Sequence, residues 1–280
     1  MPTVPDRVPP DAVSPAVVKA ADALAEAART GTACPPVRTL LDDGDIETAY
    51  LVQWLNVQRG LTAGRRIVGR KIGLTSRAVQ QQLGVAQPDF GALFADMAVP
   101  EDGVVPVGRL LQPKVEAEVA LVLGSDLPHR ECTVVDVLRA VDFALPALEI
   151  VDSRVKDWDI SITDTVADNA SCGLYVLGGS PVPLSAVNLR SVRMTMTRNS
   201  EVASEGTGAD CLGSPLNAAA WLASALAGMG DPLRAGDLVL TGALGPMAVA
   251  APGDVFEARI SNLGSVRVGF AAEAAEGDDA

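Results

Sequence analysis

The segment Leu111–Leu123 has the composition of a buried β-strand, yet it carries two glutamates, Glu116 and Glu118, one residue apart. Side chains two positions apart on a strand point to the same face of the sheet, so the two carboxylates lie side by side. Apolar residues fill the opposite face, and neither face has the composition of a solvated surface. The composition of the segment therefore favours a pair of carboxylates held inside a sheet.

A third acid, Glu149, is the only charged residue in the apolar run Ala144–Val151. Isolated buried carboxylates are disfavoured and neighbouring ones raise each other's pKa, so three together require a compensating cation. A hard divalent ion such as magnesium, manganese or calcium suits an all-oxygen ligand set. The spacing alone leaves one alternative open, in which Glu116 and Glu118 form the solvated stripe of an amphipathic strand.

The composition limits the classes of partner. A length of 280 residues fits one large domain, or a main domain with a small appendage, and 48% apolar residues suffice for a full core. The formal net charge of -13 argues against nucleic acid and against an anionic membrane surface as partners. Four cysteines without a CxxC pair predict free thiols. The absence of a signal-peptide pattern and of a membrane-spanning run predicts a cytoplasmic protein.

The first part of the chain, residues 1–66, is expected to be helical. Ser14 is a plausible N-cap for a first helix, which Gly31 would end, and apolar residues recur between them at helical spacing. Asp45 is the expected N-cap of a second helix, which Gly60 would end.

From Arg66 onward, short β-branched runs separated by glycine and proline predict a mostly β body over residues 67–272. Two helices are expected to interrupt it, one over Thr133–Leu145 and one from Ser214 to Gly228. The acidic residues 273–280 have nothing to bury and predict a disordered tail. Strands are expected at Val192–Thr197, Leu238–Thr241, Val255–Ile260 and Ser265–Phe270.

Two segments place a charged residue next to glycines. Lys71 lies in VGRKIGLTS (68–76), where glycines allow a ligand to approach the backbone and a lysine could hold a carboxylate. Asp89 lies in QPDFG (87–91), a turn by composition, and an acid beside a metal is a candidate for proton transfer. The simpler interpretations are a surface lysine at a strand end and an aspartate that bonds its own backbone.

Three further segments were candidates for binding. DTVADNASCG (164–173) contains Asn169 and Ser171, which could line a pocket wall, although a loop of Asx turns would look similar. GDLVLTGALGP (236–246) places Thr241 and Gly242 after a buried strand, where backbone amides could receive an anionic ligand. His129, the only histidine, belongs to a polar turn and is expected on the surface.

The motifs are more specific as an ordered set than singly. GRKIGLTS, PDFG, QPKVEAEVALVL, ALEIVDSR, DTVADNASCG and GDLVLTGALGP together resemble the 2-keto-4-pentenoate hydratase family, within the fumarylacetoacetate hydrolase superfamily, over about residues 45–270. The resemblance implies an α+β fold, a mixed β-roll with a helical N-terminal portion, assembled as a homo-oligomer. It also implies that Glu116, Glu118 and Glu149 bind a magnesium or manganese ion.

Carried over position by position, the resemblance makes Lys71 the active-site lysine of the family, Asp89 an acid placed beside the substrate, and Ser171 a pocket residue. On physical grounds, Lys71 is expected to neutralise and position the substrate carboxylate, and Asp89 is the candidate for moving protons. The implied activity is a metal-dependent hydratase that adds water to a 2-hydroxy-2,4-dienoate and gives a 4-hydroxy-2-oxoalkanoate, in aromatic or steroid catabolism. Association with a downstream aldolase of the same pathway is a further expectation.

Other activities use the same ligand set. A 4-oxalocrotonate decarboxylase would bind its substrate in the same way, but Trp158 followed by DTVADNASCG resembles hydratases more closely. An acylpyruvate hydrolase is a weaker alternative, because the chain lacks the histidine near its N-terminal half that hydrolytic relatives use to activate water. A catalytically silent protein that binds metal for structure is the remaining alternative.

Overall fold

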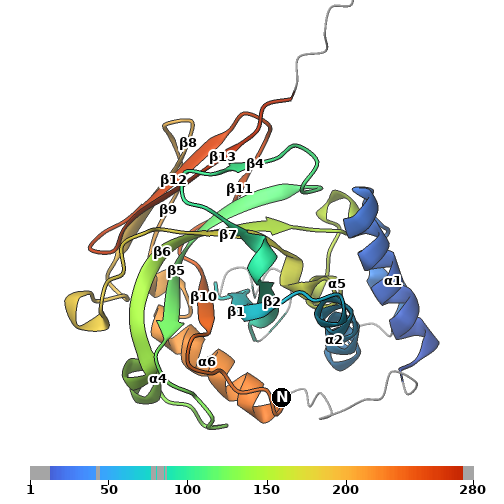
Figure 1. The fold of residues 1–280 in the computed structure, drawn as a ribbon, viewed down its shortest axis with the longest axis horizontal. Coiled ribbons are helices and arrows are strands. Elements are labelled where there is room, and N and C mark those ends of the chain that lie inside the picture. The colour runs from blue at the N-terminus through green and yellow to red at the C-terminus, as the bar shows by residue number, and fades with distance from the viewer. Residues whose placement is uncertain (1–12, 42–44, 77–79, 81–84, 86, 274–280) are drawn as a thin grey trace, which may run out of the picture.

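The fold is described from a computed structural model that covers residues 13–41, 45–76, 80, 85 and 87–273. Residues 274–280 of the predicted disordered tail lie outside this described part. The secondary structure mixes helices with two β-sheets, which confirms the predicted α+β class (Figure 1). No helix among the described residues is both long and apolar enough to cross a membrane.

The N-terminal helices begin where their capping residues predict. The Ser14 hydroxyl accepts a hydrogen bond from the Val17 amide at 3.4 Å, and Gly31 ends the first helix in the left-handed region, at φ 69°. The Asp45 carboxylate caps the second helix in the same way. The helices are α1 (Pro15–Thr30), α2 (Ile46–Thr62), α4 (Val134–Ala140), α5 (Ile162–Ala167) and α6 (Pro215–Gly228).

The predicted end of α2 at Gly60 is wrong, because the helix continues to Thr62. Gly60 is buried against the ring of Phe94, and a Cβ atom at this position would lie 3.1 Å from that ring. The glycine is therefore explained by close packing of the helix on a strand, and not by helix termination.

The strands form two sheets. The larger sheet has the order β2-β1-β10-β5-β6-β7-β3, with β11 also paired to β5, and the smaller sheet has the order β4-β13-β12-β8-β9. The four strands predicted after residue 190 are confirmed as β8, β10, β12 and β13. The strands are β1 (Ile67–Gly73), β2 (Asp89–Phe94), β3 (Ala98–Val99), β4 (Val104–Val105), β5 (Pro113–Leu123), β6 (Val141–Asp152), β7 (Cys172–Leu177), β8 (Arg193–Arg198), β9 (Glu201–Thr207), β10 (Leu238–Ala243), β11 (Ala248–Val249), β12 (Val255–Ile260) and β13 (Gly264–Phe270).

The helix predicted over Thr133–Leu145 is only half as long as expected. The capping box of Thr133 and Asp136 forms and starts α4, but the helix ends at Ala140, and Val141 begins strand β6. Strand β6 pairs with nearly the whole length of β5, from Pro113 to Leu123. Pairing with β5 therefore outweighs the local helical signal in residues 141–145.

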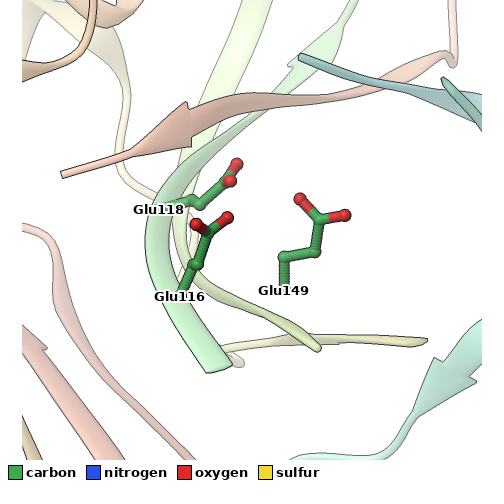
Figure 2. Close-up of side chains that lie close together, drawn as sticks. All are labelled: Glu116, Glu118 and Glu149. Carbon is green, nitrogen blue, oxygen red and sulfur yellow. The ribbon is translucent and has the colours of Figure 1, made fainter. Parts of the chain in front are cut away.

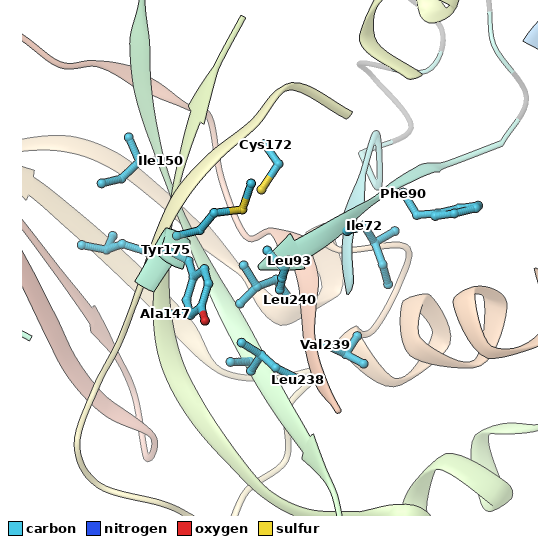
Figure 3. Close-up of a cluster of buried hydrophobic side chains, with 14 of the residues drawn as sticks. Ile72, Phe90, Leu93, Ala147, Ile150, Cys172, Tyr175, Leu238, Val239 and Leu240 are labelled. Carbon is cyan, nitrogen blue, oxygen red and sulfur yellow. The ribbon is translucent and has the colours of Figure 1, made fainter. Parts of the chain in front are cut away.

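Helices pack at the margins of the sheets. In Figure 1, α1, α2 and α5 lie together on one side and α4 and α6 lie together at the bottom. The apolar core continues between them, and Figure 3 shows a part in which Ile72, Phe90, Leu93 and Leu240 come together from β1, β2 and β10. Strands β1, β2 and β10 are thus fixed on a packed core at the point where β1 and β2 carry charged residues.

Candidate metal centre and active site

The pairing of β5 with β6 brings the three glutamates together. Glu116 lies directly opposite Glu149 in the register of the two strands, and Glu118 follows on the same face of β5. Figure 2 shows the three carboxylates pointing toward a common region. One carboxylate oxygen from each residue can be chosen so that all three lie within 4.8 Å of one another. The predicted convergence of the three acids is present in the fold.

These carboxylates are not a solvated stripe. Glu118 and Glu149 are fully buried, and Glu116 is partly buried. Glu118 Oε1 and Glu149 Oε2 have no hydrogen-bond partner among the described residues, while Glu149 Oε1 faces the Lys71 ammonium. Buried acceptors without donors are costly, so the trio has the character of a cation site. This donor set, three carboxylates and no nitrogen or sulfur, fits a hard divalent ion.

The electrostatics at Glu116 and Glu118 favour protonation of these two carboxylates as long as no further cation is bound. Burial raises the pKa of Glu116 to about 7, and the neighbouring charge of Glu149 contributes in the same direction. Burial also raises the pKa of Glu118 well above its ordinary value, with further contributions from Glu149 and Glu116. Desolvation and like charge are the two physical causes of these shifts.

Lys71 lies in the interior next to this trio. It is 2% exposed, and its Nζ atom is 3.0 Å from Glu149 Oε1 in a buried ion pair. Burial lowers the pKa of Lys71, but the charges of Glu149 and Asp89 outweigh this effect and raise it. The interpretation as a surface lysine is wrong, and the lysine remains charged beside the carboxylates.

Asp89 is the first residue of strand β2, so the predicted turn over residues 87–91 is wrong for Asp89, Phe90 and Gly91. These residues pair with β1, and Asp89 lies opposite Gly73. A Cβ atom at Gly73 would lie 2.2 Å from Asp89 Oδ1, so glycine is required there for the carboxylate to fit. Asp89 is 2% exposed, and burial raises its pKa against the opposing charge of Lys71.

Thr241 and Gly242 contact the site from strand β10. The Gly242 amide donates to Glu118 Oε2 at 2.8 Å, so the anion it receives in this structure is the protein's own carboxylate. The Thr241 hydroxyl donates to the Val119 carbonyl at 2.8 Å and is fully buried. These contacts orient Glu118, and the role of both residues in binding substrate stays a prediction.

Asn169 and Ser171 form part of a tight turn after α5, in which residues 169–171 all have φ between 52° and 55°. The Asn169 side chain makes both of its hydrogen bonds with one residue, accepting from the Ala92 amide at 2.8 Å and donating to the Ala92 carbonyl at 2.9 Å. Ser171 Oγ lies 3.2 Å from Thr165 Oγ1. Asn169 is thus bound to strand β2, and the predicted contacts of both residues with substrate remain predictions.

Three residues near Asp89 were not singled out from the sequence. Thr165 lies close enough to Asp89 to oppose the rise in the pKa of its carboxyl. Tyr50 is buried close enough to Asp89 that this charge contributes, after burial, to a pKa well above the ordinary value. Gln53 lies one turn further along α2 and is 6% exposed. A polar Gln53 on the buried face of a helix is the signal that could have identified this region.

The candidate residues that lie outside this cluster also have defined positions. His129 is exposed, as predicted. The four cysteines are free thiols, which confirms the prediction. Asp168, which shares the segment 164–173, forms a buried ion pair with Arg154 at 2.5 Å and does not belong to the carboxylate trio.

A comparison with protein-family models identifies the family of the β-sheet part of the chain. Residues 67–271 match the model of the fumarylacetoacetate (FAA) hydrolase C-terminal domain. The chain belongs to the fumarylacetoacetate hydrolase family. This match confirms the resemblance expected from the ordered motifs, and the two sheets are those of this family.

Curated members of the family are similar over nearly the whole chain. A TodF product hydratase from Pseudomonas putida strain F1 is 59% identical over 91% of this chain and 96% of its own length. 2-Keto-4-pentenoate hydratase 1 from Dechloromonas aromatica is 56% identical over 90% of this chain and 97% of its own length. A 2-hydroxyhexa-2,4-dienoate hydratase from Comamonas testosteroni is 39% identical over 88% of this chain and 94% of its own.

A solved structure with a similar fold is 4-oxalocrotonate decarboxylase from Pseudomonas putida G7, complexed with magnesium and adipate. It superposes with a TM-score of 0.88 at 36% identity, and the alignment covers 91% of this chain and 97% of that one. Fumarylpyruvate hydrolase from Pseudomonas aeruginosa, at 18% identity and a TM-score of 0.58, shares the fold.

Proposed function

We propose that this chain is a divalent-metal-dependent hydro-lyase that adds water to a 2-hydroxy-2,4-dienoate and releases a 4-hydroxy-2-oxoalkanoate in the breakdown of aromatic compounds. The observation that carries the proposal is the placement of Lys71 and Asp89 beside the three converging glutamates. Relatives named as hydratases, 52% to 59% identical over about nine-tenths of the chain, support it.

The ligands proposed for the ion are Glu116, Glu118 and Glu149. Magnesium or manganese is the proposed ion, since a decarboxylase of this fold is complexed with magnesium and a more distant hydrolase with manganese. A bound divalent cation would supply Lewis-acid stabilisation of the negative charge that develops on the 2-oxygen of the substrate. Glu118 Oε1 and Glu149 Oε2, which are buried and have no hydrogen-bond donor in the described part of the chain, support this assignment.

The neighbouring residues have distinct proposed roles. The Lys71 ammonium, held in the charged state, would neutralise and orient the substrate carboxylate. Asp89 would move a proton, because burial brings the pKa of its carboxyl above the ordinary value and thus closer to the working pH. In the overall reaction a proton leaves the 2-hydroxyl and one is added at carbon 5, after which water adds at carbon 4.

The proposed organisation follows the sequence. We propose the division predicted from the sequence, with a helical N-terminal region assigned to residues 1–66 and a catalytic β-roll domain, which takes a small-molecule substrate, assigned to residues 67–272. A homo-oligomer is proposed for the assembled enzyme. A cytoplasmic location and association with a downstream aldolase stay predictions.

A substrate comparison tests the activity. The purified chain is incubated with 2-hydroxypenta-2,4-dienoate and magnesium, with manganese, and with a chelator, and the products are identified by NMR. We expect a 4-hydroxy-2-oxoacid in the first two samples and loss of turnover with the chelator. Turnover that persists after complete metal removal would contradict the proposed metal role.

A decarboxylase is the second candidate, because the decarboxylase structure superposes over nearly the whole chain. It is tested by incubation with 2-oxo-3-hexenedioate. Release of carbon dioxide from this substrate, without conversion of the dienoate, would replace the hydratase proposal. An acylpyruvate tested in parallel would yield two acids if the chain were a hydrolase.

A further inference from the structure

Strand β2 carries Asp89 at its first residue and lies at one end of the larger sheet, with β1 as its neighbour. A strand at the end of a sheet has backbone N–H and C=O groups on its outer side that no further strand pairs. Unless other groups bond them, such a strand can shift or fray, and any side chain at its start shifts with it. The groups on the outer side of β2 are therefore relevant to where Asp89 points.

Two side-chain amides bond this outer side. Gln53 of helix α2 donates from Nε2 to the Phe90 carbonyl at 3.0 Å and to the Val166 carbonyl of helix α5 at 2.9 Å. This side chain is buried, so water does not compete for the same acceptors. Gln53 therefore joins α2, β2 and α5 at the residue that directly follows Asp89.

Asn169 hydrogen bonds to Ala92, the next residue of β2 whose backbone groups face outward. Its amide oxygen and nitrogen form a pair of hydrogen bonds with the Ala92 amide and carbonyl, at 2.8 and 2.9 Å, which is the pattern that a neighbouring strand would provide. The approach is close, because a Cβ atom at Gly91 would lie 2.3 Å from the Asn169 carbonyl oxygen. Asn169 has φ 55°, a conformation that asparagine tolerates better than most residues.

Helix α5 also lies close to the Asp89 side chain. Thr165 on α5 is near enough to act on the pKa of the Asp89 carboxyl, and the Val166 carbonyl accepts from the same Gln53 amide as the Phe90 carbonyl. Strand β2 thus lies against α5 and the turn that follows it. A shift of β2 along this element would break its bonds to Gln53 and Asn169 together.

We propose that Gln53 and Asn169 are positioning residues, whose amides replace a missing strand along the outer side of β2 and so fix the direction of the Asp89 carboxylate. The inference rests on the proposed function, because it assigns the amides a role in turnover only if Asp89 moves a proton. It assigns Asn169 a role through β2 and not through contact with substrate. It also gives the N-terminal helical region, through Gln53, a part in the active site.

Three variants test this inference. Gln53→Met keeps the length of the side chain and removes both hydrogen bonds, and Asn169→Gly removes the pair to Ala92 at a position where glycine tolerates the positive φ. Asn56→Leu is the matched control. Asn56 is an amide on the same helix, one turn after Gln53, but it donates to the Ala21 carbonyl of α1 at 3.0 Å instead of to β2.

Each variant is assayed with saturating magnesium for kcat and KM, for metal affinity, for melting temperature, and for hydrogen exchange of a peptide that covers β2. We expect Gln53→Met and Asn169→Gly to lower kcat about 10-fold to 100-fold, since small misplacement of a reacting group has effects of this size. KM and metal affinity should change less than about threefold, and exchange in β2 should become faster. Asn56→Leu should leave kcat and β2 exchange unchanged.

A structural role alone would lower the melting temperature of all three variants and leave kcat of the folded enzyme intact, and that result would overturn the inference. Asp89→Asn separates this failure from failure of the proposed function. If Asp89→Asn abolishes turnover while both amide variants retain full kcat, only the positioning role is wrong. If Asp89→Asn retains turnover, the proposed proton transfer is wrong and the positioning role falls with it.

Discussion

At the scale of single residues, charge balance dominates the site. The ammonium of Lys71 lies near four buried or partly buried carboxylates, those of Glu116, Glu118, Glu149 and Asp89. One buried cation cannot offset four carboxylates, so either some of them hold protons or a further cation is bound. The raised pKa values of Glu116 and Glu118 correspond to the first alternative, in which carboxylates hold protons. The proposed divalent ion corresponds to the second alternative.

Removal of one proposed ligand should abolish the metal site without unfolding the protein. Glu118→Gln keeps the shape of the side chain and its acceptor for the Gly242 amide, but it removes a charge from the trio. We expect metal affinity to fall by at least about 100-fold, the upper end of what loss of an outer-shell partner costs, with turnover lost and the fold retained. Calorimetry with magnesium and circular dichroism measure the two effects.

Glu205→Gln is the matched control for this change, since Glu205 is an exposed glutamate on strand β9 of the other sheet. It should alter neither metal affinity nor turnover. Equal behaviour of the two variants would indicate that Glu118 is not a ligand.

Metal affinity should rise with pH. The pKa of Glu116 is raised in the fold from an ordinary value of 4.5 to about 7, so the metal-free fold binds a proton that the ion has to displace. Displacement of this proton makes the Kd for magnesium fall about tenfold per pH unit below the pKa, and the raised pKa of Glu118 should make the dependence steeper or extend it to higher pH. Titrations between pH 5.5 and 8.5 test this expectation, and an affinity independent of pH would contradict it.

The raised pKa of Glu116 also determines how the stability of the metal-free protein changes with pH. Because the folded pKa of Glu116 lies above the unfolded value, the folded state binds more protons between pH 4.5 and 7. Its contribution to stability is fully present below pH 4.5 and is lost as the pH rises through 7. The stabilisation by added metal should accordingly be larger at pH 8 than at pH 6.

At the scale of elements, close approach of β1 and β10 fixes the strand that carries Lys71. Gly69 is paired with Leu238, and a Cβ atom at Gly69 would lie 1.9 Å from the Leu238 carbonyl oxygen. The obstructing atom belongs to the backbone and cannot rotate away. The two strands can only pair in this register if residue 69 has no side chain.

Gly69→Ala should therefore destabilise the protein. We expect a loss of about 3 kcal/mol in the free energy of unfolding, the upper range for overpacking in a core. Gly228→Ala is the control, since Gly228 is the last residue of helix α6 and a Cβ atom there meets no atom within 4 Å. It should be neutral or stabilise by up to about 1 kcal/mol, and denaturant unfolding of both variants makes the comparison.

Elements were predictable where local and tertiary preferences agree. Helices α1 and α6 begin at their Ser-Pro caps, and strands β8, β10, β12 and β13 lie where β-branched runs predicted them. The predictions for residues 141–145 and for Asp89 were wrong because the conformation of these residues is determined by pairing with strands distant in sequence, β5 and β1. The burial of Lys71 could not be predicted from its own segment, and its expected role rests on the ordered motifs.

Parts of the site lay beyond local sequence patterns for the same reason. The convergence of Glu116 and Glu118 with Glu149 could be inferred, because buried acids need a shared cation. The hydrogen bonds of Gln53 and Asn169 to β2 could not be inferred from the sequence. They depend on how α2 and the turn after α5 pack on a strand that is distant in the chain, more than 30 residues from Gln53 and more than 70 residues from Asn169.

At the scale of the whole molecule, the ligands proposed for the ion lie on two strands of the larger sheet, β5 and β6, and not on a loop. Strands β5 and β6 have β10 and β7 as their outer neighbours, so a ligand that binds them stabilises the middle of the larger sheet. Binding that is restricted to the folded state raises the free energy of unfolding of the whole cooperative unit.

Magnesium should therefore raise the melting temperature. At a concentration of 100 times Kd the stabilisation is about 2.7 kcal/mol, which corresponds to about 5 °C for a chain of this size. Thermal unfolding followed by circular dichroism, with magnesium and after addition of a chelator, measures the shift. Glu118→Gln should lose the shift, and an equal shift in this variant would show that the ion binds elsewhere.

The register of β5 against β6 determines where the chain can change in length. Addition or loss of a single residue within either strand would reverse which side of the sheet its side chains face, and Glu149 would no longer be opposite Glu116. The connection between the strands, residues 124–140, enters none of these pairings. Insertions and deletions should accordingly be tolerated in the exposed turn of that connection, residues 128–131, and abolish activity within the two strands.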